Sequence, residues 1–317
     1  MTTAHPQRAA AIDIGSNTFR MLIAEPAQSG PTPWHTVHYG HRIVRLGEGL
    51  HHSGRLGEPG MLRAMQAFEQ FAAILRQHGV QPHEANAVAT AAMREAENGK
   101  VFAREVEERT GIRIRVIDGN SEAAMSLQGS CAVLAPETRH DMLLFDIGGG
   151  STEFIRAADG KSRDAISRKL GVVRLVESFL HTDPPSQGDY AAMLKAADEH
   201  LAEVEKFWGN RDVPKHLVGT AGTVTTLAAV ELDLCPYDAN VINNHRMPKT
   251  TFMSLRDRLL SMNHADRQAI RTIEQGRADL IVAGLAIIEA VLTRWNFDEL
   301  VVVDAGLLEG AWLKTIL

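Results

Sequence analysis

The sequence predicts an α/β protein made of two related halves, and two observations support this prediction. Residues 13–18 and residues 146–152 form similar glycine-containing turns with hydroxyl side chains, and each turn lies between two apolar stretches. An apolar run, a glycine turn and a second apolar run are typical of two strands joined by a loop. Strand-like and helix-like segments then alternate in both halves of the 317 residues, which favours mixed sheets covered by helices.

In the first half, turn residues bound each predicted element. Proline and glycine in residues 26–33 indicate a loop, and residues 37–50 are predicted to form a strand that ends in a glycine-rich loop. Residues 59–78 carry apolar side chains at helical spacing and precede Gly79, which predicts a helix ending there. The other elements predicted up to residue 134 are a strand at 85–90, a helix at 91–110 interrupted near Asn98 and Gly99, a strand at 112–117, a turn at 118–121 and a helix at 122–134.

The second half repeats the alternation after its glycine turn. The predicted elements are helices at 172–179 and 190–208, a strand at 215–218, helices at 224–232 and 284–295, a strand at 299–303 and a helix at 307–316. We therefore expect one domain over residues 1–125 and a second over residues 126–304. The last helix, in residues 305–317, is expected to pack back on the first domain.

The composition excludes several classes of protein. A formal net charge of −6 argues against a general nucleic-acid binder, which needs a basic stripe. Two cysteines, Cys131 and Cys235, are too few for a disulfide framework. The N-terminus lacks the apolar region of a secretory signal, and no apolar run is long enough to span a membrane. We expect a cytoplasmic protein without a nucleic-acid or membrane partner.

Glycine turns of this kind can bind phosphate. Glycine lets the backbone approach an anion, and successive N–H groups of a turn can donate to phosphate oxygens. The aspartate at the end of each preceding strand, Asp13 or Asp146, can hold a divalent cation against those phosphates. One such turn is explained equally well by hairpin geometry, but two copies favour a ligand site. Neither copy has the GxxxxGK[ST] or GxGxxG pattern of the common nucleotide-binding motifs.

The ordered set of motifs resembles the exopolyphosphatase and guanosine pentaphosphate phosphatase family (Ppx/GppA) in its short, two-domain form. The matching segments span essentially the whole chain and are residues 11–18, 44–49, 89–96, 118–123, 146–153, 219–223 and 304–310. The resemblance implies an actin-like ATPase (ribonuclease H-like) fold, with two α/β domains around a central cleft. It also implies release of terminal orthophosphate from inorganic polyphosphate or guanosine pentaphosphate (pppGpp) with Mg²⁺, and it allows a K⁺ ion and a homodimer.

The same resemblance assigns roles to individual residues. It makes Glu122 the general base that activates water, places Arg94 and Glu153 in the catalytic set, and gives Asp13, Asp146 and Glu153 to Mg²⁺. The expected phosphate-binding residues are Gly15, Ser16, Asn17, Thr18, Arg45, Gly148, Gly149, Gly150, Ser151, Thr152, Gly219, Thr220, Gly222 and Thr223. From the residues alone, Glu122 is explained equally well as a carboxylate at a helix N-terminus. Asp13 is likewise explained as a turn cap, and Glu153 as a strand residue on a solvated face.

Four positions depart from the family pattern. Ser121 and Ala124 stand where the family often has glutamate and arginine, Ala221 where it usually has glycine, and Leu308 where a basic residue is common. Two other functions also stay open: an ATP-dependent kinase of the same superfamily and a non-catalytic (p)ppGpp-binding sensor. The lack of a separate segment for an acceptor substrate disfavours the kinase. The presence of Glu122, Asp146 and Glu153 disfavours the sensor.

Overall fold

The computed structural model describes residues 8–316, which divide into two compact units. Unit 1 comprises residues 8–133 and 305–316, and unit 2 comprises residues 134–304. The division follows helix α5 (Gly119–Val133), so the boundary expected after residue 125 lies inside a continuous helix. Helix α14 (Leu307–Ile316) belongs to unit 1, where the indole Nε1 of Trp312 donates a hydrogen bond to the backbone oxygen of Ala9 at 3.0 Å.

Unit 1 contains a five-stranded mixed sheet in the order β3-β2-β1-β4-β5. The first three strands form an antiparallel meander, and β4 and β5 run parallel to β1. The strands are β1 (Ala9–Ile14), β2 (Thr18–Pro26), β3 (Trp34–Ile43), β4 (Asn86–Ala89) and β5 (Ile114–Val116). The other helices of this unit are α1 (Leu50–Ser53), α2 (Glu58–Gln77), the 3₁₀ helix η1 (Pro82–Glu84), α3 (Ala91–Glu95) and α4 (Gly99–Thr110).

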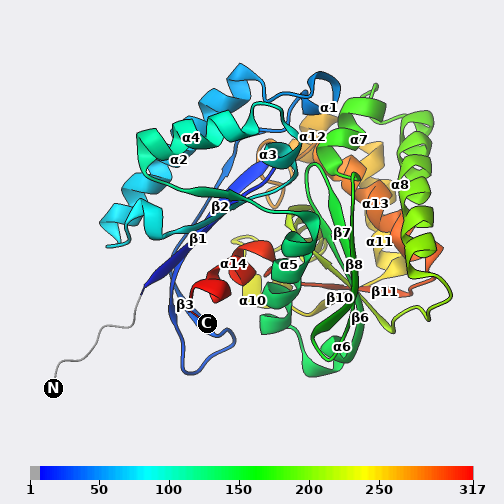
Figure 1. The fold of residues 1–317 in the computed structure, drawn as a ribbon. Coiled ribbons are helices and arrows are strands. Elements are labelled where there is room, and N and C mark those ends of the chain that lie inside the picture. The colour runs from blue at the N-terminus through cyan, green and yellow to red at the C-terminus, as the bar shows by residue number, and fades with distance from the viewer. Residues whose placement is uncertain (1–7, 317) are drawn as a thin grey trace. The chain divides into compact units, whose positions relative to one another are not determined.

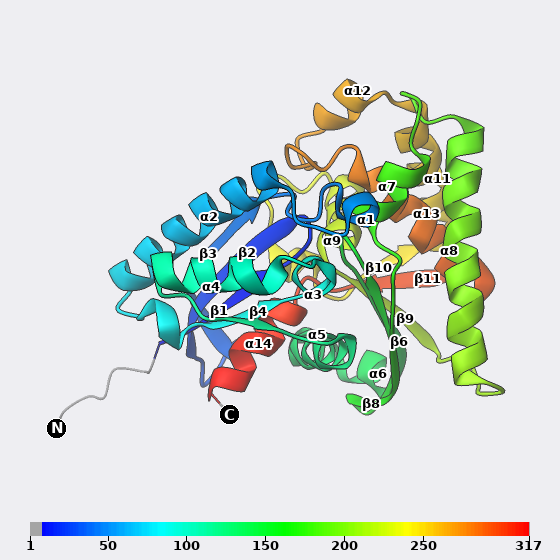
Figure 2. The same cartoon turned by 45° about the horizontal axis from the view of Figure 1, so that its top comes forward.

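Helices cover both faces of the unit 1 sheet. Ile12 and Ile14 of β1 face a core shared with α2 and α4, while α14 packs on the other face of the sheet. Figures 1 and 2 show α2 and α4 on one side of this sheet, and α5 and α14 on the other. Helices α5 and α14 are in close contact at Gly310. A Cβ atom added there would lie 1.9 Å from the backbone oxygen of Met125, so only glycine allows this contact.

Unit 2 repeats this topology. Its six-stranded sheet has the order β10-β11-β9-β6-β7-β8. The strands β8-β7-β6-β9-β11 match β3-β2-β1-β4-β5 in order and direction. The strands are β6 (Asp141–Ile147), β7 (Thr152–Ala158), β8 (Lys161–Arg168), β9 (His216–Thr220), β10 (His245–Pro248) and β11 (Glu299–Val302). This repetition confirms the predicted duplicated, two-domain actin-like fold.

The helices of unit 2 build the larger hydrophobic core. They are α6 (Pro136–His140), α7 (Val172–Phe179), α8 (Gln187–Trp208), α9 (Gly222–Glu231), α10 (Ala239–Ile242), α11 (Lys249–Ser261), α12 (His264–Gln268) and α13 (Leu280–Arg294). Helices α8, α11 and α13 lie on the same side of the unit 2 sheet in both views (Figures 1 and 2). Within residues 8–316, no helix combines the length and the apolar character needed to cross a membrane.

Several elements of unit 2 were not predicted from the sequence. Strand β8 has mostly exposed or half-buried residues, because an edge strand needs little apolar sequence, and its pattern is therefore weak. Strand β10 and helix α11 were also missed. In unit 1, the predicted break in the helix at 91–110 is confirmed. A Cβ atom on Gly99 would lie 2.3 Å from the backbone oxygen of Met93, so glycine permits this tight break.

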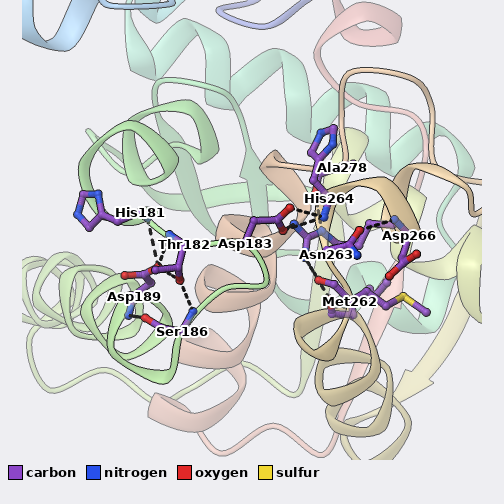
Figure 3. Close-up of polar contacts among 12 residues, drawn as sticks. His181, Thr182, Asp183, Ser186, Asp189, Met262, Asn263, His264, Asp266 and Ala278 are labelled. Atoms are coloured by element: carbon purple, nitrogen blue, oxygen red, sulfur yellow. Dashed lines mark hydrogen bonds and ion pairs between the residues drawn. The ribbon is translucent and has the colours of Figure 1, made fainter.

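The connection from α7 to α8 is held by an acidic cap (Figure 3). The Asp189 carboxylate accepts hydrogen bonds from the Thr182 hydroxyl at 2.7 Å and from the backbone N–H groups of Thr182 and His181 at 3.0 and 3.2 Å. Ser186 caps α8 by accepting the N–H of Asp189. The hydrogen bond from Thr182, followed by the backbone bonds, lowers the pKa of Asp189 from 3.8 to about 2.

This cap predicts an acid-sensitive contribution to stability. The folded-state pKa of Asp189 lies below the unfolded value, so the stabilisation is complete above 3.8 and is lost as the pH falls towards about 2. We therefore expect Asp189→Asn to lower the midpoint of thermal unfolding at neutral pH and to lose that effect near the folded-state pKa. The exposed Asp233→Asn is the control, and an equal effect of Asp189→Asn at both pH values would contradict the prediction.

Candidate phosphate-binding loops and acidic residues

The two glycine turns have the same geometry. In unit 1, the N–H of Gly15 donates to the backbone oxygen of Thr18 at 3.2 Å, and in unit 2 the N–H of Gly148 donates to that of Ser151 at 2.8 Å. A Cβ atom on Gly15 or Gly148 would lie 2.9 or 3.0 Å from the same oxygen. The backbone therefore leaves no room for a side chain at Gly15 and very little at Gly148.

Each turn follows an aspartate on the corresponding face of its sheet. Ile12 and Ile14 face the core of unit 1, so Asp13 between them lies on the opposite face. Phe145 and Ile147 face the core of unit 2, and Asp146 takes the equivalent place. The two aspartates therefore occupy equivalent positions in the two sheets, as the duplicated sequence pattern predicted.

A second segment of unit 1 is bound to the first turn. The backbone oxygen of Asn17 accepts the N–H groups of Val44 and Arg45 at 2.8 and 2.9 Å, and that of Ser16 accepts the N–H of Gly47 at 2.8 Å. These bonds place the backbone of Arg45 against the predicted phosphate-binding residues. The side-chain oxygen Oδ1 of Asn17 is buried and has no hydrogen-bond partner among residues 8–316, so it can accept a bond from a water molecule.

Sequence reasoning missed Arg63 of α2, which holds this second segment. Its Nε atom donates to the backbone oxygen of Val44 at 2.7 Å, and its Nη2 atom pairs with Glu48 at 2.8 Å. No local pattern separates Arg63 from the other charged residues of an amphipathic helix.

The turn of unit 2 presents free backbone donors. The N–H groups of Gly149, Gly150 and Ser151 donate no hydrogen bond within the described part of the chain, residues 8–316. The carbonyl groups of the loop hold it in place, because the backbone oxygens of Gly148 and Gly149 accept hydrogen bonds from the N–H groups of the first two residues of α7 at 3.1 and 2.9 Å. A loop held in place with N–H groups that have no acceptor among the described residues is suited to binding phosphate oxygens.

Two neighbours fix this loop further. A Cβ atom on Gly171 would lie 2.2 Å from the backbone oxygen of Gly149, so a side chain at that position would displace the loop. The hydroxyl of Thr152 donates to the backbone oxygen of Leu170. Thr152 was predicted as a site residue, whereas Gly171 was missed because the sequence does not reveal its close contact with the loop.

An acidic pair lies beside this loop. Asp146 on β6 is directly opposite Glu153 on β7, and Thr220 on β9 and Ser167 on β8 extend the row on either side. Glu153 is only 1 % exposed, so the alternative of a solvated strand face is wrong for this residue. The next row, which contains Phe145 and Phe154, faces the core of the unit.

The acidic pair has suitable chemistry for Mg²⁺. Carboxylate and hydroxyl oxygens are ligands that hard divalent cations accept. Asp146 and Glu153 belong to unit 2 and Asp13 to unit 1. Among residues 8–316, no three His, Cys, Asp or Glu side chains form a group that could hold a metal ion. With only Asp146 and Glu153 as protein ligands, a Mg²⁺ ion here would need its other ligands from water and substrate phosphates, as Mg²⁺ commonly does.

The other predicted catalytic residues meet in unit 1. Glu122 lies in the first turn of α5 and is 6 % exposed. The Nη1 atom of Arg94, from α3, donates to Glu122 Oε2 at 3.0 Å and to the backbone oxygen of Ile117 at 2.8 Å. Arg94 thus fixes the orientation of the Glu122 carboxylate. A carboxylate that only stabilises a helix N-terminus does not need a fixed orientation.

Asp118 caps the same helix. Its Oδ1 atom accepts the N–H of Ser121 at 2.8 Å. The backbone and hydroxyl hydrogen bonds of Ser121 hold the pKa of Asp118 below its ordinary value, with a smaller contribution from Arg94. Ser121, one of the departures from the family pattern, is thus part of the turn that presents Glu122.

The third predicted loop contains a strained residue. Ala221 precedes α9 with φ 74° and ψ 173°, a region of backbone space that is essentially reserved for glycine. This conformation gives a physical reason for the glycine that the family usually has here. Leu308, another departure, is 1 % exposed in α14 and contributes to the packing of unit 1.

We expect Ala221→Gly to raise the free energy of unfolding of unit 2 by about 1 kcal/mol. Relief of backbone strain outweighs the greater entropy of glycine in the unfolded chain. Ala228→Gly is the matched control, because it makes the same change inside α9, where helix propensity and packing both favour alanine. Denaturant unfolding measures both variants. A destabilised Ala221→Gly variant would show that Ala221 is not strained.

Comparisons with known proteins identify relatives over nearly the whole chain. Residues 22–317 match the Ppx/GppA phosphatase family. Exopolyphosphatase 2 of Mycobacterium tuberculosis is 32 % identical over 321 residues, covering 97 % of this chain and 98 % of that protein.

Solved structures extend the likeness to three dimensions. The crystal structure of an exopolyphosphatase from Cytophaga hutchinsonii has a TM-score of 0.88 at 30 % identity, covering 98 % of this chain and 97 % of that one. That of the Aquifex aeolicus Ppx/GppA family member has a TM-score of 0.80 at 28 % identity, covering 98 % of each chain. The chain therefore belongs to the Ppx/GppA phosphatase family.

Proposed function

We propose that this chain is a phosphoanhydride hydrolase that releases terminal orthophosphate from inorganic polyphosphate. Guanosine pentaphosphate carries a comparable terminal anhydride and is the second proposed substrate. The observation that carries the proposal is the loop of unit 2, whose free N–H groups adjoin the acidic pair Asp146 and Glu153. Relatives named exopolyphosphatase that match nearly the full chain support the choice of polyphosphate.

The residues suggest a direct attack by water. Glu122 accepts a proton from the water molecule as its oxygen bonds to the terminal phosphorus, and the bridging P–O bond breaks. The products are orthophosphate and a substrate shortened by one phosphate, whose new terminal oxygen carries the bond electrons. Arg94 holds Glu122 in place at 3.0 Å.

The remaining roles concern binding and charge. The N–H groups of Gly149, Gly150 and Ser151 are proposed to donate to the terminal phosphate, with further phosphate contacts from the loops at residues 15–18 and 219–223. Asp146 and Glu153 would hold Mg²⁺, which neutralises phosphate charge when it is bound. Cys131 and Cys235 form no disulfide within residues 8–316, in keeping with a proposed cytoplasmic location.

Orthophosphate release tests this function. The purified chain is incubated with Mg²⁺ and either long-chain polyphosphate or pppGpp, and products are resolved by size. Release from polyphosphate with stepwise shortening supports the proposal, and release from pppGpp defines the second substrate. Tight (p)ppGpp binding without release would indicate a sensor. ATP consumption that depends on an added sugar or acetate would indicate a kinase.

A further inference from the structure

Ser167 of β8 is hydrogen-bonded to one of the proposed metal ligands. Its hydroxyl donates to Glu153 Oε1 at 2.6 Å, a short bond of the kind made to a charged acceptor. The two residues are directly opposite each other on neighbouring strands, so the strand register places their side chains side by side. Neither the fold prediction nor the family motifs singled out Ser167.

The setting of Glu153 explains why such a partner matters. The Glu153 side chain is buried and lies directly opposite Asp146, and like charges at directly opposed positions of a sheet repel. A glutamate also has three side-chain torsions, so without a fixed partner its carboxylate can turn away from its neighbour. A hydroxyl donor on the far side of Glu153 from Asp146 holds one carboxylate oxygen and restricts these torsions.

We propose that Ser167 is a positioning residue that orients Glu153 for binding the divalent cation. The inference rests on the proposed function, since it takes Asp146 and Glu153 as the metal-binding pair. Ser167 itself is not proposed to touch the substrate. Outer partners of this kind commonly change metal affinity by about 10- to 100-fold when they are removed.

Binding of Mn²⁺, a paramagnetic substitute for Mg²⁺, tests the inference without turnover. Free Mn²⁺ is measured by electron paramagnetic resonance during titration of wild type, Ser167→Ala and Ser167→Thr. We expect Ser167→Ala to raise the dissociation constant about 10- to 100-fold and Ser167→Thr, which keeps the hydroxyl, to stay near wild type. Ser162→Ala is the matched control, because Ser162 lies exposed on the same strand, opposite Ala157.

Glu153→Gln tests whether Glu153 is a metal ligand, separately from the role of Ser167. If Glu153→Gln weakens Mn²⁺ binding and Ser167→Ala does not, Glu153 is a ligand and the role of Ser167 is refuted. If Glu153→Gln leaves Mn²⁺ binding unchanged, the proposed metal pair itself fails. Thermal unfolding of each variant shows whether the fold is retained, and Ser167→Thr keeps the test informative if Ser167→Ala is unstable.

Discussion

Replacing Glu122 with glutamine is expected to lower kcat on polyphosphate by about 10²- to 10⁴-fold, the usual effect of losing a general base. Glutamine has nearly the same shape, and its side-chain oxygen can still accept the hydrogen bond from Arg94. The variant should therefore keep its fold and its KM. Steady-state orthophosphate release over a range of substrate concentrations separates the effect on kcat from that on KM.

Glu58→Gln is the control for this experiment. Glu58 is an exposed carboxylate in the first turn of α2, and Glu122 likewise lies in the first turn of its helix, α5. We expect Glu58→Gln to leave kcat unchanged. A small effect of Glu122→Gln, similar to that of Glu58→Gln, would favour the helix-terminal role and remove Glu122 as the base.

Replacing Arg267 with methionine is expected to lower the free energy of unfolding by about 3 kcal/mol. The Arg267 side chain is 2 % exposed. Its guanidinium donates to the backbone oxygens of Ala278 at 2.9 Å, Leu259 at 3.4 Å and Met262. Methionine would remove these bonds, and within residues 8–316 only the oxygen of Leu259 would keep another donor, the N–H of Met262. Asp183, which also pairs with Arg267, is half-exposed and can be solvated in the variant.

The neighbouring Arg271 provides the comparison. Its side chain is 69 % exposed and pairs with the exposed Asp233, so we expect Arg271→Met to change the free energy of unfolding by no more than about 0.5 kcal/mol. Urea unfolding followed by circular dichroism measures both variants. Equal stabilities of Arg267→Met and Arg271→Met would show that the hydrogen bonds of Arg267 do not hold this part of unit 2.

The sequence predicted the features that repeat. Two glycine turns after apolar strands indicated the duplication, because the close backbone approach at Gly15 and Gly148 favours glycine in both copies. The break near Gly99 was predictable for the same reason. These features depend on local backbone geometry, which the sequence of a short segment specifies.

Features that depend on tertiary contacts were not predictable. Ser167 is recognisable only when the register of β7 and β8 is known, and β8 itself has little apolar pattern. Gly171 and Arg63 matter because they touch loops distant in sequence, at Gly149 and Val44. Glu153 was open to a solvated interpretation until its place in the sheet showed it to be buried.

In the proposed reaction, water attacks the terminal phosphorus of the substrate. This attack can be followed by running polyphosphate hydrolysis in water enriched in ¹⁸O and analysing the released orthophosphate by mass spectrometry. We expect one ¹⁸O atom in each orthophosphate released in a single turnover, and a greatly reduced rate of labelling with Glu122→Gln. Orthophosphate released without ¹⁸O, or a phosphoryl group found on another acceptor, would contradict this mechanism.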